Sequence, residues 1–330
     1  MVKYFLNGEG RALVRSEDFS PHCWVDMISP TDDEVATVCA RTGIPEDMIK
    51  SALDEEEMAR TEFDEGCYLY IVDCPIIEES EAGDTYSTLP LALIHNDNCI
   101  MTVSLKGNPV LKDFITGRTR IDCTDSKHFI LNFLLGNAKR FLYCLKQIDR
   151  KSQRVQAELG NKLKNDDILQ LLELENSLVY FSTSLNSNAN VHDKLHRVEE
   201  IAKSEENEDV YEDLVIECNQ AIEMCKIYKD TLSVSMDAYG SVISNNANDS
   251  MKKLTIITIL LAIPTMIAGF WGMNMPVPFD VASGETWGGW FFIVISVALI
   301  ITAVVAAVML RGNPIRKMKG KRSKKNKKRK

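Results

Sequence analysis

The apolar residues of this chain are spread unevenly, and their spacing changes twice along its length. Up to about residue 125, short runs of β-branched and aromatic residues alternate with turn signals and two amphipathic segments. From about residue 126 the apolar positions recur at helical spacing, and glycine and proline become rare. Positions 254–279 and 286–310 then contain no charged residue. The pattern predicts an α+β head, a long helical stalk and a transmembrane hairpin of two helices.

Within the head, local signals predict individual elements. Asn7-Gly8-Glu9-Gly10 is typical of a hairpin turn. Thr31 is a good N-cap for a helix, and Pro45 suits the first turn of the next. The expected strands are 3–6, 11–15, 23–28, 67–77, 89–95 and 100–105, with a turn at 96–98, and the expected helices are 32–42 and 46–57.

The stalk pattern predicts three helices, and the third continues without a breaker into the first apolar run. A single helix from Asp209 to Met273 would be nearly 100 Å long. A helix of this length needs neighbours to stabilise it, so a bundle or coiled-coil stalk is expected.

The two apolar runs are each about 25 residues long, whereas the bilayer core needs roughly 20 helical residues. Two buried core helices of a soluble domain are the alternative. The expected division is therefore 1–125 for the head, 126–253 for the stalk, 254–274 for the first span, 275–286 for the outer loop, 287–310 for the second span and 311–330 for the tail.

Charge predicts how the hairpin is oriented. The tail at 311–330 holds 12 Lys/Arg and no acid, whereas positions 1–253 hold 26 basic and 45 acidic residues, a balance of −19. Lys252 and Lys253 precede the first span, and positive charge favours the cytoplasmic side. Both termini are thus expected in the cytoplasm of a prokaryotic cell, with the hairpin in its plasma (inner) membrane. The tail is expected at anionic lipid headgroups, with nucleic acid as the disfavoured alternative partner.

Nine scattered cysteines, without a CxxC pair, are typical of reduced thiols rather than of a disulfide framework or zinc site. The N-terminus lacks the apolar stretch of a secretory signal, so the hairpin itself is expected to direct insertion.

A stripe of small and hydroxyl residues follows one face of the first span. Its positions are separated by 4, 3, 4, 3 and 4 residues, a heptad seam. Such a seam allows close helix packing, which is one interpretation. The other is a pore wall shared by several copies, because one chain offers only two spans. The seam consists of Met251, Thr255 with Leu254 beside it, Thr258, Ala262, Thr265 and Gly269.

The outer end of this span carries Gly272, Met273 and Asn274. Gly272 permits a tight turn. A ring of Asn274 amides suits Mg²⁺, which keeps several of its waters when bound, although Asn274 could equally be a helix C-cap. Asp280 and Glu285 in the loop would raise the local cation concentration.

The segment Ile267-Ala268-Gly269-Phe270-Trp271-Gly272-Met273-Asn274, in this two-span layout, resembles the CorA family of metal-ion transporters. The resemblance implies a funnel-shaped homopentamer with Asn274 as its outer selectivity ring. It implies a pore lined by Thr258, Thr265 and Gly269, a hydrophobic gate at Leu254 and Met251, and a polar ring at Asn248. Ala262 and Trp271 depart from the residues common in the family, which affects the expected ion preference.

The acidic balance suggests regulation by cytosolic Mg²⁺. Subunits that carry this charge repel one another, and divalent ions between them would relieve the repulsion and hold the channel closed. The alternative for each acid is an ordinary solvated position. The candidates are Glu78, Glu79, Glu81 and Asp84 in the head and Asp209, Glu212, Asp213 and Asp237 in the stalk, of which Asp213 and Asp237 match family sites by position.

The expected function is therefore an Mg²⁺ channel or transporter that is driven by the membrane potential and needs no organic cofactor. One rival is a transporter of the same family that prefers Zn²⁺, Co²⁺ or Ni²⁺. Those ions favour nitrogen and sulfur ligands, whereas the proposed pore offers mainly oxygen, with Met251 and Met273 as possible soft contacts and no His or Cys. Another is a membrane-tethered sensor or scaffold without transport. An enzyme is not expected, because the five histidines form no recognisable catalytic set.

Overall fold

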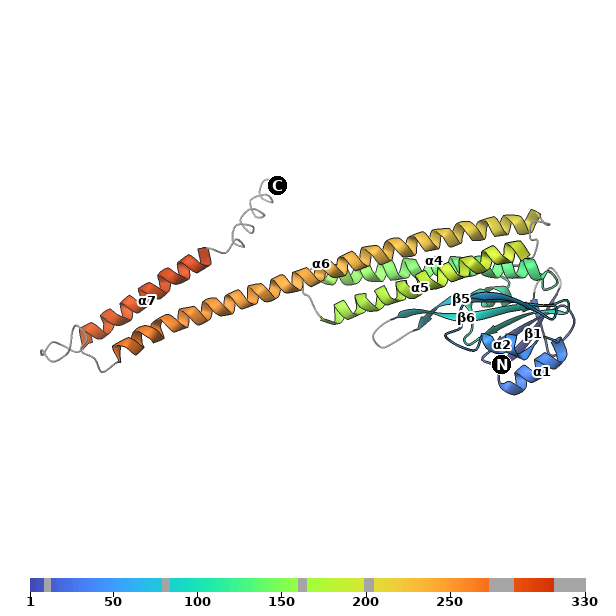
Figure 1. Cartoon of the computed structure of the whole chain (residues 1–330), viewed down its shortest axis with the longest axis horizontal. Coiled ribbons are helices and arrows are strands. Elements are labelled where there is room, and N and C mark those ends of the chain that lie inside the picture. The colour runs from blue at the N-terminus through green and yellow to red at the C-terminus, as the bar shows by residue number, and fades with distance from the viewer. Residues whose placement is uncertain (9–12, 79–83, 160–164, 199–204, 273–287, 312–330) are drawn as a thin grey trace. The chain divides into compact units, whose positions relative to one another are not determined.

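A computed structural model describes the chain except for residues 9–12, 79–83, 160–164, 199–204, 273–287 and 312–330 (Figure 1). The chain divides into two compact units, Met1–Ala238 and Tyr239–Lys330. One helix, α6 (Glu205–Trp271), begins in the first unit and ends in the second. The unbroken run of helical spacing predicted this continuity, and the structure confirms it.

The head is built on a seven-stranded mixed sheet of order β2-β1-β3-β7-β6-β5-β4. The pair β3–β7 is parallel and the other pairs are antiparallel. The chain thus builds one side of the sheet from β1 to β3 and the other from β4 to β7, and joins them at the parallel pair. The strands are β1 (Val2–Asn7), β2 (Leu13–Ser16), β3 (Cys23–Ile28), β4 (Arg60–Asp64), β5 (Cys67–Glu78), β6 (Thr85–His95) and β7 (Cys99–Ser104).

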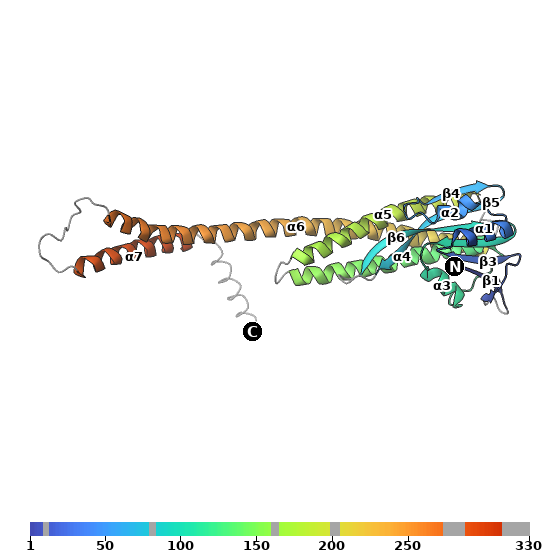
Figure 2. The ribbon, with the colours of Figure 1, turned by 90° about the horizontal axis from the view of Figure 1, so that it is seen from below.

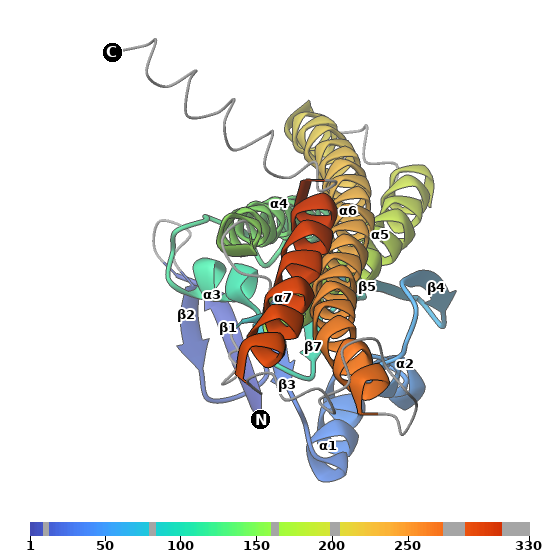
Figure 3. The same ribbon diagram turned by 90° about the vertical axis from the view of Figure 1, so that its left-hand side faces the viewer.

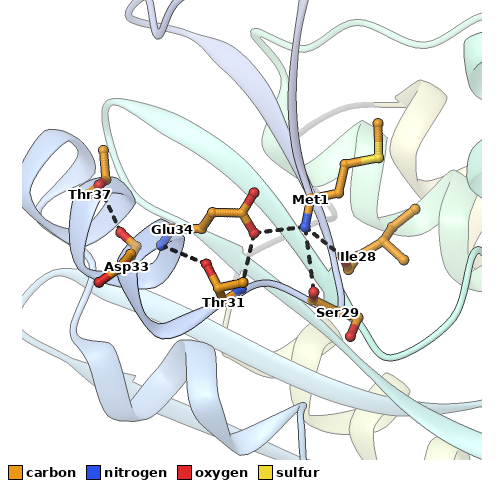
Figure 4. Close-up of polar contacts among 7 residues, drawn as sticks. All are labelled: Met1, Ile28, Ser29, Thr31, Asp33, Glu34 and Thr37. Atoms are coloured by element: carbon orange, nitrogen blue, oxygen red, sulfur yellow. Dashed lines mark hydrogen bonds and ion pairs between the residues drawn. The ribbon is translucent and has the colours of Figure 1, made fainter.

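Helix α1 (Asp32–Thr42) begins at a capping box, as its sequence predicts. The Thr31 hydroxyl accepts a hydrogen bond from the backbone N–H of Glu34, whose carboxylate accepts one from the N–H of Thr31. The same carboxylate lies 2.8 Å from the amino group of Met1, which also donates to the carbonyl of Ile28 (Figure 4). The start of the helix is thereby tied to the first strand.

Alternating side chains of the strands form two cores, one on each face of the sheet. On one face, residues such as Val25 and Ile94 pack with α1 and α2 (Glu46–Ser51). On the other, Trp24 contacts Phe5 at 4.8 Å and Phe129 at 5.3 Å between ring centroids. That second face packs on α3 (Pro109–Ile115) and α4 (Ser126–Leu159), so the sheet is anchored on the stalk.

The stalk consists of α4, α5 (Asn165–Val198) and the first part of α6 (Figure 2). Phe141 of α4 and Phe181 of α5 meet edge to face at 5.1 Å. Leu214, Cys218, Ala221, Cys225 and Leu232 form the buried stripe of α6, at the 3- and 4-residue spacing of a helical bundle.

The second unit contains the rest of α6 and α7 (Gly288–Arg311). Within the described residues, one helix is long and apolar enough to cross a membrane: a window of Asn207–Phe270 has a mean hydropathy of 1.9 and is not buried at all. The corresponding apolar stretch of α7, Ile293–Met309, is shorter.

Four elements differ from the local expectations. The helix expected over 46–57 ends at Ser51, because Asp54 Oδ1 accepts a hydrogen bond from the N–H of Glu56 and stabilises a turn instead. Strand β4 and helix α3 were not expected. The expected strand 89–95 begins earlier, at Thr85, because its partner β5 continues to Glu78.

Candidate ion pathway

The predicted seam is exposed on α6, as are Ile257 and Leu261 outside it. Met251 and Leu254 are each 65% exposed. By contrast, Ile256, Ile259, Leu260, Ile263 and Ile267 are only partly exposed and share another face of the helix. The exposed seam also includes Asn248, Thr255, Thr258, Ala262, Thr265 and Gly269.

The three threonine hydroxyls of the seam have the same geometry. Each donates a hydrogen bond of 2.9 Å to a carbonyl one turn earlier, Thr255 to Met251, Thr258 to Leu254 and Thr265 to Leu261. Because the hydroxyl proton is used inside the helix, the oxygen lone pairs remain available as acceptors on the exposed side. A hydrated cation presents O–H donors, so this surface is suited to its hydration shell.

Backbone geometry changes toward the end of the helix. Pro264 lies inside α6 and lacks the N–H that would bond to the carbonyl of Leu260. The N–H of Gly272 donates to the carbonyl of Ala268 at 3.0 Å, and a Cβ at Gly272 would make only ordinary contacts, the nearest at 3.5 Å. The tight turn expected at Gly272 therefore does not by itself require glycine.

The remaining predicted filter residues, Met273 and Asn274, lie outside the described residues, as do Asp280 and Glu285 in the loop. Their roles stay predictions.

The candidate regulatory acids that the structure describes do not form a metal-binding group of three within one chain. Asp213 and Asp237 are exposed on α6, as are Asp209 and Glu212. In the described part of the chain, no three His, Cys, Asp or Glu side chains are placed to share a metal ion.

In the head, two of the candidates have other contacts. Glu78 forms an ion pair with Lys106, which raises the pKa of that lysine. The backbone carbonyl of Asp84 accepts a hydrogen bond of 2.7 Å from Lys151. Glu79 and Glu81 lie outside the described residues.

The cysteine thiols of the chain do not belong to the seam. All nine cysteines are free thiols and eight are buried. Burial raises the pKa of Cys144 and Cys218 to about 11 and that of Cys123 to about 12, so these thiols stay protonated. The described pathway thus offers oxygen atoms and the thioether of Met251.

The sequence analysis began the seam at Met251, but the same seven-residue spacing continues toward the N-terminus of α6. Counting back from Asn248, it reaches Ser241, Val234 and Ile227, and all four side chains are exposed. An isoleucine and a valine on an exposed helix face suggest a covering partner. The repeat itself was the signal that could have identified them.

Comparisons with known proteins agree with this geometry. The family model described as "CorA-like Mg2+ transporter protein" matches residues 20–316. The cobalt/magnesium transport protein CorA of Methanocaldococcus jannaschii is 28% identical over 286 residues, which cover 85% of this chain and 88% of that protein. The protein of the same name from Thermotoga maritima is 22% identical over 311 residues, 93% of this chain and 86% of that one.

Solved structures show the same fold. The complete structure of the CorA magnesium transporter from Methanocaldococcus jannaschii has a TM-score of 0.77 to this chain at 23% identity, covering 95% of this chain and 98% of that one. The expected α+β head, long helix and apolar C-terminal helices thus correspond to a known architecture. Because the family match spans most of its length, this chain belongs to the CorA-like Mg²⁺ transporter family, whose members are membrane transporters.

Proposed function

We propose that this chain assembles into a homopentameric channel that conducts Mg²⁺ into the cell, with one α6 per subunit lining the pore. The observation that carries the proposal is the exposed threonine seam, whose hydroxyl oxygens are left as acceptors. A single chain presents one such seam, so several copies are needed to enclose an ion. The number five comes from the family resemblance.

The proposed ion keeps part of its water shell. Mg²⁺ sheds its waters reluctantly, and a wall of hydroxyl oxygens can hydrogen-bond those waters without replacing them. Gly272, Met273 and Asn274 would form the outer filter, where a ring of neutral amides binds more weakly than carboxylates and so permits release. Asp280 and Glu285 would attract cations to the outer mouth.

The proposed topology has two spans, with α7 as the second, and both termini in the cytoplasm. Lys252, Lys253 and the basic tail support this orientation through the preference of positive charge for the inside. Moving one divalent ion inward through 100 mV gains roughly 4.6 kcal/mol, twice the single-charge value. The membrane potential is then sufficient to drive influx, and no coupled enzyme activity is required.

The proposed gate is the pair Met251 and Leu254, whose apolar side chains would repel water when they converge on the axis. Cytosolic Mg²⁺ would hold it closed by bridging carboxylates of neighbouring subunits, with Asp213 and Asp237 as the principal candidates. Their exposure in the single chain supports a role between subunits.

Cobalt is a second candidate cargo. Two relatives carry the name cobalt/magnesium transport protein, and Met251 places a thioether, a softer ligand than oxygen, on the seam.

The experiment is ion uptake into liposomes containing the purified full-length protein. Mg²⁺, Co²⁺, Ni²⁺ and Zn²⁺ are compared for the wild type and for Asn274→Ala. We expect wild-type Mg²⁺ uptake that increases with an inside-negative potential and is lost in the variant. Absence of uptake for every ion would indicate a tethered sensor or scaffold, and selective Co²⁺ uptake would favour the second cargo.

A further inference from the structure

One exposed face of α4 is basic. Lys139, Lys146, Arg150 and Arg154 are exposed and follow one another at 7-, 4- and 4-residue steps, so they share a face of the helix. Tyr143 lies in the same row, 47% exposed, with the guanidinium of Arg140 4.8 Å from its ring centroid. We call these four basic residues and Tyr143 the α4 stripe.

One exposed face of α5 is apolar. Leu169 is 56% exposed and Tyr180 is 60% exposed, and Leu172 and Val179 lie between them on the same side of the helix. Glu173 is exposed beside Leu172. This group, the α5 stripe, is too apolar for an ordinary solvated helix face, so a covering surface is expected.

The two stripes lie at the same height along the stalk. Phe141 of α4 meets Phe181 of α5, and Asn137 and Asn188 both donate to the carbonyl of Asp73. Because the helices run in opposite directions with equal rise per residue, the α4 stripe is level with the α5 stripe.

The stripes also lie on opposite flanks of the stalk. Figures 2 and 3 show α4 and α5 on opposite sides of α6. Each stripe is opposite the buried face of its own helix, which contains Phe141 in α4 and Phe181 in α5. The α4 stripe therefore cannot cover the α5 stripe of the same chain.

We infer that the α4 stripe of one copy packs against the α5 stripe of the next copy, in a head-to-tail contact that closes a ring. This inference rests on the proposed channel, in which α6 lines the axis. Copies related by rotation about that axis meet at equal height, and a heterologous ring needs complementary surfaces on opposite flanks. The two stripes meet both requirements.

Three of the residues of the α4 stripe become level with a suitable partner. Arg150 is level with Glu173, which gives an ion pair between copies. Tyr143 is level with Tyr180, and Arg154 can lay its aliphatic stem on Leu169. An exposed ion pair contributes little energy by itself, so the apolar and aromatic contacts hold the surfaces together and the charges fix the register.

The test is cross-linking between two versions of the full-length protein that carry tags of different size. Both contain Cys39→Ser, which removes the one native thiol that is not buried. One version carries Arg150→Cys and the other Glu173→Cys, and the co-expressed, detergent-solubilised protein is treated with a short bismaleimide. We expect a covalent dimer of one large and one small chain. Lys112→Cys, an exposed position on α3, replaces Arg150→Cys in the matched control and should give no link to Glu173→Cys.

Two results would overturn the inference. If two Arg150→Cys chains cross-link with each other as well as Arg150→Cys does with Glu173→Cys, the contact is two-fold. If protein that conducts Mg²⁺ gives no mixed link, the two stripes do not form the contact between copies. A mixed link in protein that shows no ion flux would support the interface but contradict the proposed channel function. As a second measurement, Arg150→Glu and Glu173→Arg should each lower the oligomeric fraction, and the double reversal should restore it.

Discussion

An asparagine of α5 fastens the stalk to the sheet, and its removal should weaken the first unit. Asn188 is 2% exposed. Its Oδ1 accepts a hydrogen bond from the backbone N–H of Asp73, and its Nδ2 donates to the carbonyl of the same residue, both at 2.9 Å. Asn137 of α4 donates to that carbonyl as well, at 2.8 Å. Asn188→Leu keeps a similar side-chain volume and removes both bonds.

The expected loss follows from which groups are left without a partner. The carbonyl of Asp73 keeps its bond from Asn137, whereas its N–H loses its acceptor. A buried donor left unsatisfied costs about 1–3 kcal/mol, and because this site is part-buried we expect the lower part of that range, about 1–2 kcal/mol. For a unit of this size, about 2–4 °C in Tm accompanies each kcal/mol. The variant should therefore unfold about 2–8 °C below the wild type.

The buried cysteines supply the assay. Eight of nine thiols are buried, and Cys39 is the exception. In a Cys39→Ser background, a thiol-reactive dye therefore becomes fluorescent only as the protein unfolds. Asn186→Leu is the matched control, because Asn186 is exposed on the same helix and its Nδ2 donates to the carbonyl of Ser182 one turn away. The control should stay within about 0.5 kcal/mol of the wild type. If Asn188→Leu and Asn186→Leu both unfold at the wild-type Tm, the hydrogen bonds of Asn188 do not contribute to stability and the prediction is refuted.

Three further predictions concern transport and pH. Thr258→Val removes an exposed acceptor and should lower Mg²⁺ flux by about 2- to 10-fold, from about 0.5–1.5 kcal/mol for one hydrogen bond, whereas Thr302→Val on α7, which removes a hydroxyl bonded to Ala298, should conduct normally. Neutralising Asp213 and Asp237 should raise the cytosolic Mg²⁺ concentration needed for block, and unchanged potency in patch-clamp or flux measurements would end the regulatory proposal. Burial lowers the pKa of His192 to about 4, from an ordinary 6.5. The unfolded state binds the extra proton, so stability should be full above about pH 6.5 and fall toward pH 4. The Tm of His192→Leu should depend less on pH over that window, and an equally steep profile would show that other groups dominate.

Local structure was largely predictable wherever a short-range signal dictated it. The Thr31 cap and the helix after it are confirmed at the predicted bounds. The hairpin around Asn7 is also confirmed, as β1 and β2 pair antiparallel. The unbroken helix α6 followed from sustained helical spacing, and it continues through Gly240, Pro264 and Gly269. In each case interactions between residues close in the chain favour the element, so it could be predicted without knowledge of distant contacts.

The elements that the sequence did not predict are those stabilised by contacts between residues distant in the chain. Strand β4 forms because residues Arg60–Asp64 pair with β5. Its short, charged sequence has no strong strand preference of its own. Helix α3 is short and depends on packing Phe114 against Phe129 at 5.4 Å between ring centroids. The parallel pairing of β3 with β7 joins strands some 70 residues apart, which no local pattern encodes.

The sequence by itself determined the division into an α+β head, a helical stalk and apolar helices, together with the threonine seam, because periodicity and charge are properties of neighbouring residues. The tertiary structure decided which helix faces of the stalk stay uncovered: the basic row of α4 and the apolar row of α5 became distinguishable only once packing had used the other faces. Exposure depends on what a residue meets in space. A repeat along the chain can therefore predict a face but not whether another part of the molecule covers it.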